Sequence, residues 1–214
     1  MSTFDDYIRS CAHNENLEAK VLGVGGSPRK GGNSDVLMQH IVRGVSKSGM
    51  FAGSLQLRDY RYGGCIGCER CRKDKICTGL KDGMTLIYPE LIESRGLILV
   101  SPTHNYNVTA WMKAFVDRLY CFYHFEDSRP RQWSSRLSGQ GRKAVLAAVC
   151  EQEKAADMGF TLDAMRLPLE ALGYEIVGAL PVLGIFDKGK VKKKPEVLSQ
   201  AAALGAKLAE SLLQ

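Results

Sequence analysis

Four cysteines lie close together in the segment 63–79, and their spacing is suited to binding a metal centre. They are Cys65, Cys68, Cys71 and Cys77, in the pattern C-x2-C-x2-C-x5-C. Three thiols at three-residue intervals can curl round one cubic cluster, and a fourth can return to close it, as in ferredoxin-type runs. Gly64 and Gly67 lower the steric cost of that curl. The spacing therefore favours an iron–sulfur cluster.

Two other uses of these thiols stay open. Structural zinc usually takes two separated C-x2-C pairs, so three ligands this close together suit it less well. The thiols could also be unligated or redox-active. Nearby basic residues would offset the negative charge of four thiolates and raise the potential of a cluster; they are Arg70, Arg72, Lys73 and Lys75.

The chain has seven cysteines, an odd number that argues against a disulfide scaffold and predicts a reducing, cytoplasmic location. The formal charge of +6 favours an anionic cofactor without implying nucleic acid. The basic run 188–194 is typical of a solvated loop before a helix. We expect no signal peptide in the polar first 20 residues, and no membrane span, because no stretch approaches about 18 apolar residues.

A second stretch with chemical potential is 21–37, VLGVGGSPRKGGNSDVL. An apolar run ends in a glycine-rich turn, after which apolar residues recur at helical spacing. Such a turn exposes backbone N–H groups, the first helical turn adds partial positive charge, and Ser27, Arg29 and Ser34 can donate hydrogen bonds. We therefore expect a phosphate site. The alternative is a surface loop with a helix cap at Asn33 or Ser34.

Two known phosphate motifs are excluded in this stretch. A Walker loop needs Gly-Lys-Ser/Thr before the helix, whereas Gly32 is followed by Asn33. The dinucleotide pattern GxGxxG fails because Pro28 stands where its third glycine belongs. A single phosphate, as in flavin mononucleotide (FMN), fits a loop this short and rich in hydroxyl groups.

The loop 101–108, SPTHNYNV, follows an apolar strand and can hydrogen-bond the edge of a heterocycle, with Tyr106 as a stacking face. The alternative is a helix entrance capped by Asn107 or Thr109. His104 is a candidate for a proton relay or a packed polar residue. The loop 150–153 carries a weaker signal of the same kind.

Five apolar strands alternate with helices along the chain. The strands are expected at about 21–25, 53–58, 96–101, 143–149 and 175–180, and the helices at 36–45, 84–94, 109–120, 155–172 (kinked near Pro168) and 195–213. This alternation predicts an α/β fold, a flavodoxin-like, doubly wound five-stranded parallel sheet with helices on both faces. We expect an N-terminal extension over 1–18 and a single domain over 19–214 with the cysteine-rich insertion at about 63–79. The long loop 122–141 is expected to be a lid or an interface segment.

With these residues in view, the chain resembles the iron–sulfur flavoprotein family, a branch of the flavodoxin-like NADPH-dependent FMN reductases. The resemblance is carried by GSPRKGGNS (26–34), the four-cysteine run, Asp82-Gly83-Met84 and SPTHNYNVTAWMKAFVDR (101–118). It implies a [4Fe-4S] cluster on the four cysteines and an FMN cofactor. It places the phosphate near Ser27, Arg29, Asn33 and Ser34, and the isoalloxazine ring near Pro102, Thr103, His104, Asn105, Tyr106 and Asn107. It also implies a homodimer or homotetramer and a redox carrier such as a ferredoxin or NAD(P)H.

The expected function is that of an electron-transfer flavoprotein, in which electrons pass between a [4Fe-4S] cluster and FMN at the same rim of the sheet. The alternative is an NAD(P)H-dependent FMN or quinone reductase whose cysteines are structural or bind zinc.

Overall fold

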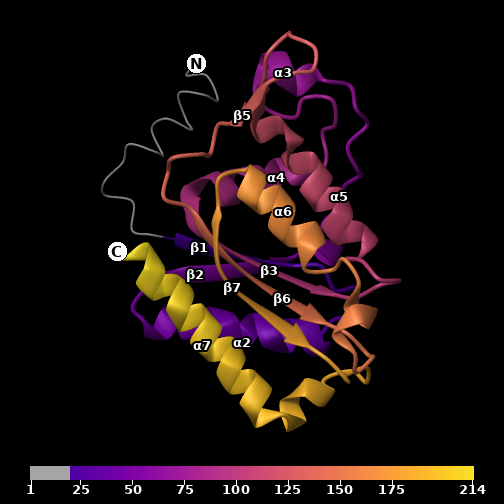
Figure 1. Ribbon diagram of the computed structural model, residues 1–214, viewed down its shortest axis with the longest axis vertical. Helices are drawn as coiled ribbons and strands as arrows, with labels where there is room; N and C mark the ends of the chain where they lie inside the picture. Colours follow the sequence, from indigo (N-terminus) through magenta and orange to yellow (C-terminus); the bar gives the residue numbers. More distant parts are fainter. Residues whose placement is uncertain (1–19) are drawn as a thin grey trace.

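The structure is a computed structural model that describes residues 20–214, so the expected extension over 1–18 lies outside the described residues (Figure 1). Five parallel strands form one sheet in the order β2-β1-β3-β6-β7. They are β1 (Lys20–Gly25), β2 (Ala52–Gln56), β3 (Ser94–Pro102), β6 (Lys143–Val149) and β7 (Glu175–Val182). The order reverses beside β1, which confirms the predicted doubly wound, flavodoxin-like arrangement.

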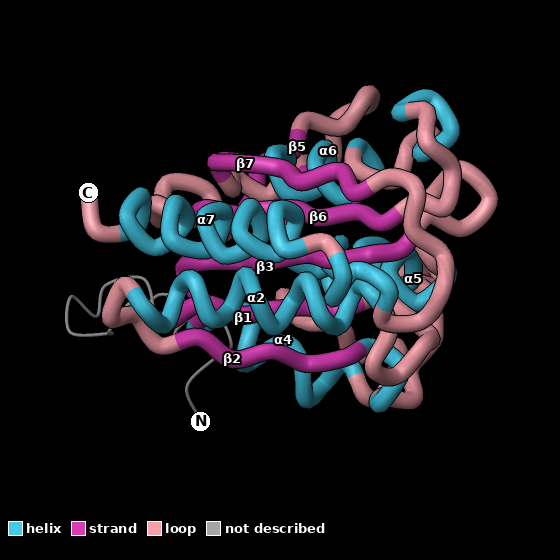
Figure 2. The backbone as a smooth tube through the Cα atoms, turned by 90° about the horizontal axis from the view of Figure 1, so that it is seen from below, coloured by secondary structure: helices cyan, strands magenta, loops and turns pink. Residues whose placement is uncertain are grey.

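Helices cover both faces of the sheet (Figures 1 and 2). One face packs against α2 (Asn33–Lys47) and α7 (Pro195–Leu212), and the other against α4 (Met84–Glu93), α5 (Ala110–Arg118) and α6 (Asp163–Ala171). Successive residues of a strand point to opposite faces: Val21 packs on the α2 side, and Leu22 and Val24 pack on the α4–α5 side. Because helices cover both faces, the central strands β1, β3 and β6 carry buried apolar runs, which is why they were predictable from the sequence, whereas the edge strands β2 and β7 are only partly buried.

The expected helix over 155–172 is wrong in one respect, because the chain breaks near Gly159 and not at Pro168. A short 3-10 turn, η3 (Ala155–Met158), comes first, and Pro168 lies inside α6. Gly159 adopts φ +56°, a left-handed conformation that favours glycine. This turn lets the Phe160 N–H donate a 2.8 Å hydrogen bond to the Tyr106 carbonyl, which joins two loops at the rim of the sheet.

The long loop 122–141 contains a small antiparallel hairpin of β4 (Tyr123–Phe125) and β5 (Trp133–Ser135). Strands of three residues are too short for alternation to reveal them, so these two were not predicted. Tyr120, which precedes the hairpin, stacks on Phe125 at 5.0 Å between ring centroids, and within the hairpin Tyr123 meets Trp133 edge-on at 5.2 Å.

In the part of the chain that the structure describes, no helix is long and apolar enough to cross a membrane.

Candidate functional site

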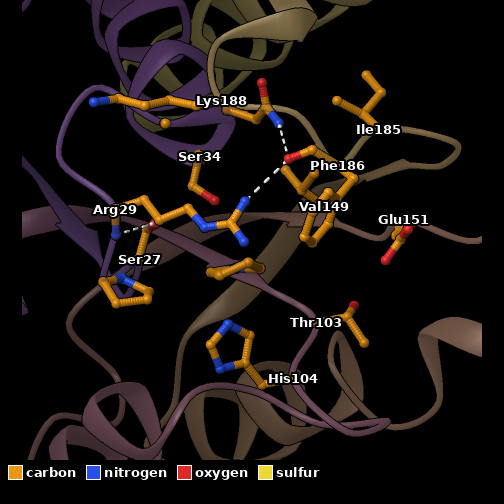
Figure 3. A pocket seen from close by; sticks show the side chains of 14 residues that line it. Ser27, Arg29, Ser34, Thr103, His104, Val149, Glu151, Ile185, Phe186 and Lys188 are labelled. Carbon is orange, nitrogen blue, oxygen red and sulfur yellow. Dashed lines mark hydrogen bonds between the residues drawn. The ribbon is translucent and has the colours of Figure 1, made fainter.

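A cavity of about 120 Å³ lies at the carboxyl ends of the strands, between the loops that follow β1, β3, β6 and β7 (Figure 3). We call it the rim cavity. It brings together seven of the residues predicted to bind a cofactor: Ser27, Arg29, Asn33, Ser34, Pro102, Thr103 and His104. This is the place where open parallel sheets bind their ligands.

One end of the rim cavity presents hydrogen-bond donors that have no partner in the described part of the chain. The Ser34 residue is only 4% exposed, and its hydroxyl makes no hydrogen bond to any described group. The backbone N–H groups of Asn33, Ser34 and Asp35, in the first turn of α2, also lack partners in the described part of the chain. Buried donors of this kind are satisfied by a ligand or by water, and the helix dipole favours a negative one.

A buried ion pair behind the glycine-rich turn fixes its shape. The Gly31 N–H donates to Asp35 Oδ2 at 2.7 Å, with Gly31 at φ +67°. Arg58 donates to both Asp35 oxygens, at 2.9 and 2.8 Å, and to the Ser27 carbonyl at 3.0 Å. The Asp35 charge is therefore balanced inside the protein, and the turn is held in one conformation.

Asn33 and Arg29 also contact a segment that the sequence did not link to this site. The Asn33 amide donates to the Asp187 carbonyl at 3.0 Å and accepts from the Val191 N–H at 3.1 Å. The Arg29 guanidinium lies 4.5 Å from the Phe186 ring centroid and donates to the Phe186 carbonyl at 3.1 Å. The Asn33 side chain is thus committed to loop contacts, whereas Arg29 keeps further N–H donors for a ligand.

The other end of the rim cavity is formed by the loop after β3. Pro102, Thr103 and His104 line it, whereas Asn105, Tyr106 and Asn107 lie outside the cavity. His104 and Asn107 exchange two backbone hydrogen bonds, of 2.8 and 3.1 Å, which close a tight turn. The Thr109 side chain accepts a hydrogen bond from the Met112 N–H and caps α5. The loop therefore also forms the helix entrance that the sequence offered as its alternative role.

This turn holds two non-glycine residues in the left-handed region, Asn105 at φ +49° and Tyr106 at φ +64°. A bulky residue such as tyrosine is uncommon there, and such strain costs on the order of 1–3 kcal/mol. The Tyr106 ring is exposed, so packing does not offset the cost. The imidazole of His104 is also exposed and makes no hydrogen bond within the described part of the chain, which leaves both rings available to a ligand.

Glu151 comes from the loop 150–153, to which the sequence analysis gave a weaker signal, and four further lining residues were missed: Val149, Ile185, Phe186 and Lys188. Val149 ends β6, and the other three follow β7. Their one available signal is that each ends or follows a parallel strand, at the edge where ligands bind.

The four cysteines line a second cavity, of about 230 Å³, together with Leu80, Gly79 and Tyr120. We call it the cysteine cavity. The backbone curls round it through left-handed conformations at Gly67 (φ +65°), Glu69 (φ +55°) and Lys75 (φ +59°). A Cβ on Gly79 would collide with the Cys68 sulfur, so the glycine leaves room for that thiol. The spacing of the four cysteines thus brings all four thiols to one hollow.

In the described residues, no three His, Cys, Asp or Glu side chains are grouped tightly enough to hold a single metal ion. A zinc site needs its ligands to converge on one point, whereas a cubic cluster binds each thiolate through a different iron atom. Burial raises the pKa of the Cys71 thiol, and the neighbouring Cys77 and Cys65 raise it further. The donor set fits a cluster, which would have to displace these protons as it binds.

A buried ion pair joins the two ends of the cysteine segment. Arg118, whose side chain is 1% exposed, donates to both Asp82 oxygens at 2.7 and 3.1 Å and to the Gly63 carbonyl at 2.9 Å. The Gly63 N–H donates in turn to Asp82. Burial alone would raise the pKa of Asp82, but hydrogen bonds from Arg118 and from backbone N–H groups hold it below its usual value.

The β4–β5 hairpin holds the middle of the same segment, α3 (Arg70–Asp74). Arg131 pairs with Glu69 at 2.8 Å, and Arg72 pairs with Asp127 at 2.9 Å. One of the four basic residues expected to offset the charge of a cluster is therefore already paired.

The two cavities lie at opposite ends of α5, so the expectation of a shared rim is wrong. α5 begins just after the ring-side loop, and α3 packs against η2 (Leu119–Phe122), which follows its far end (Figure 1). Because α5 has nine residues, its two ends lie about 13 Å apart. The cause is the long segment after η1 (Leu57–Asp59), which leaves the rim and runs along α5, as the contacts of Tyr62 with the Trp111 carbonyl and Gly63 with Arg118 show.

Comparison with known proteins identifies the family and the fold of this chain. Residues 19–158 match the family described as NADPH-dependent FMN reductase. Two proteins of Archaeoglobus fulgidus, both named iron-sulfur flavoprotein, are similar to the chain: one is 32% identical over 90% of this chain and 80% of its own length. The other is 33% identical over 89% of this chain and 94% of its own length. A flavodoxin from the domain Archaea superposes with a TM-score of 0.54 at 12% identity, covering 91% of this chain and 99% of its own, which shows the common fold.

Proposed function

This chain belongs to the NADPH-dependent FMN reductase family and is a flavin-dependent oxidoreductase; on that premise we propose that it binds FMN in the rim cavity and a [4Fe-4S] cluster in the cysteine cavity, and passes electrons between them. One observation carries the proposal of a cluster: a single cavity is lined by all four cysteines, Cys65, Cys68, Cys71 and Cys77. Relatives of similar length that are named iron-sulfur flavoproteins support it.

We place the phosphate of FMN at the first turn of α2. There the Ser34 hydroxyl, the unpartnered N–H groups and Arg29 supply donors and positive charge. Ser27 lies on the same side, and Asn33 acts by fixing the segment after β7. The ring would then extend toward Pro102, Thr103 and His104, with Asn105, Tyr106 and Asn107 shaping that end from outside.

The chemistry comes from the cofactors, since FMN accepts electrons in pairs and can release them singly, and a [4Fe-4S] cluster carries one at a time. The protein contributes the shape and charge of the two cavities and the helix between them. His104, exposed in the wall of the rim cavity, is the candidate to exchange a proton with the ring.

The external partner is proposed to be a ferredoxin-like carrier or NAD(P)H, and the assembly a homodimer or homotetramer. We propose the reducing cytoplasm as its location because a cluster held by four thiolates and an odd number of cysteines, seven, both suit a reducing compartment.

Anaerobic stopped-flow reduction tests the proposal against the reductase alternative. We mix the oxidised protein with NADPH or with a reduced low-potential ferredoxin and follow flavin and iron–sulfur absorbance together. We expect the ferredoxin to reduce both centres, with the iron–sulfur bleaching no slower than that of the flavin. Fast reduction of flavin by NADPH, with iron–sulfur absorbance absent or unchanged, would favour an ordinary reductase with structural or zinc-binding cysteines.

A further inference from the structure

The segment after β7, residues 185–191, is fixed against the glycine-rich turn of the rim cavity. Three contacts described above hold it: Arg29 on Phe186, and Asn33 with Asp187 and Val191. Ile185 and Val191 anchor its two ends, since they are 2% and 0% exposed. The residues between them are therefore held at the site, although the sequence suggested a solvated basic loop.

Lys188 is the cation that this segment brings to the anion end of the rim cavity. It lines the cavity, and its Cε lies 3.7 Å from the position a Cβ on Gly31 would take. In the view of Figure 3 Lys188 lies on the same side of the cavity as Ser34, whereas Glu151 lies on the opposite side, as Thr103 does. The positive and negative groups of the cavity are thus separated along its length.

The charge of a phosphate monoester requires more than Arg29 supplies. Such a group carries between about −1.5 and −2 at neutral pH. Asp35, the nearest acid in the turn, is already balanced by Arg58. Among the described residues, Arg29 and Lys188 are the two remaining cations that line the cavity, and together they match a dianion.

We propose that Lys188 is a phosphate-binding residue of this site, brought to it by a segment more than 150 positions away from the glycine-rich turn. The inference rests on the proposed position of the FMN phosphate. It predicts that Lys188 distinguishes FMN from riboflavin, the same ring system without the phosphate.

The test measures dissociation constants of FMN and riboflavin by flavin fluorescence quenching, using the full chain stripped of flavin, at low ionic strength. We expect Lys188→Ala to weaken FMN binding about tenfold and to change riboflavin binding less than about twofold, with the difference shrinking as salt is added. Lys188→Arg should retain FMN affinity. Lys190→Ala is the matched control: it removes the same charge from the same segment, but Lys190 pairs with Asp187 at 3.3 Å.

Two results would overturn the role of Lys188. If Lys188→Ala and Lys190→Ala weaken FMN binding equally, the effect comes from the net charge of the segment and not from Lys188 itself. If Lys188→Ala weakens the binding of FMN and of riboflavin equally, the residue only supports the fold of the segment.

Ser34→Ala separates this inference from the proposed function. If Ser34→Ala weakens the binding of FMN more than that of riboflavin and Lys188→Ala does not, the phosphate lies where proposed and the inference about Lys188 is wrong. If neither variant distinguishes FMN from riboflavin, the proposed phosphate position is wrong as well.

Discussion

Replacing Cys68 with serine is expected to remove nearly all of the iron from the protein while leaving FMN bound at its normal occupancy. Serine is a poor ligand for iron–sulfur clusters compared with a thiolate, and a cubic cluster needs all four corners. The Cys68 sulfur lies in the cysteine cavity, which shares no lining residue with the rim cavity. Iron and flavin contents of anaerobically purified protein, measured on the same sample, report the result.

Cys121→Ser is the matched control, because Cys121 is buried outside the cysteine cavity. Its sulfur donates to the Arg118 carbonyl, a hydrogen bond that a serine hydroxyl can keep. Burial raises the pKa of this thiol to about 12, which is typical of an inert structural cysteine. Normal iron in Cys68→Ser, or joint loss of iron and flavin from it, would contradict the assignment of two separate sites.

The second large effect is expected from Asp82→Asn, which should lower the free energy of unfolding by about 3 kcal/mol. The substitution leaves the buried Arg118 charge without its partner, and breaking such pairs typically costs about 3–5 kcal/mol. We expect a cost at the lower end of this range because the Asp82 side chain is 18% exposed. Against total stabilities of about 5–15 kcal/mol, this is a large fraction. Urea unfolding followed by circular dichroism measures it.

The measurement is best made in the Cys68→Ser background, because loss of a bound cluster would itself lower stability. Asp163→Asn, which breaks the exposed pair with Arg166, serves as the control and should cost less than about 1 kcal/mol. The pKa of Asp82 is lowered in the folded protein, so its contribution is present above its unfolded pKa and is lost as pH falls through the folded value. A stability difference between the proteins with and without Asp82→Asn that does not narrow on acidification below about pH 4 would contradict this account.

Strands and glycine-rich turns were predictable because their signals are local. An apolar run such as 143–149 is buried on both sides, and β6 spans those residues as expected. The turn after β1 combines glycines, hydroxyl groups and a helix start within about ten residues, and the structure places it at the rim of the sheet. The four cysteines likewise lie within one short segment, so their meeting in one cavity follows from their spacing.

The features that escaped prediction depend on contacts between distant segments. The amide of Asn33 is used by backbone groups near residue 190, and nothing in either stretch indicates the other. The separation of the two cavities follows from Arg118 and Asp82, which draw the cysteine segment along α5 and away from the rim. The β4–β5 hairpin has strands too short to give a pattern.

The number of electrons that the protein takes up tests the central proposal most directly. Anaerobic titration of the oxidised protein with a calibrated low-potential reductant, followed by visible absorbance, gives electrons per protein-bound FMN. A protein that holds one FMN and one [4Fe-4S] cluster should accept about three, two for the flavin and one for the cluster. An end point at about two, with no broad iron–sulfur absorbance to bleach, would contradict the account and leave a reductase with flavin alone.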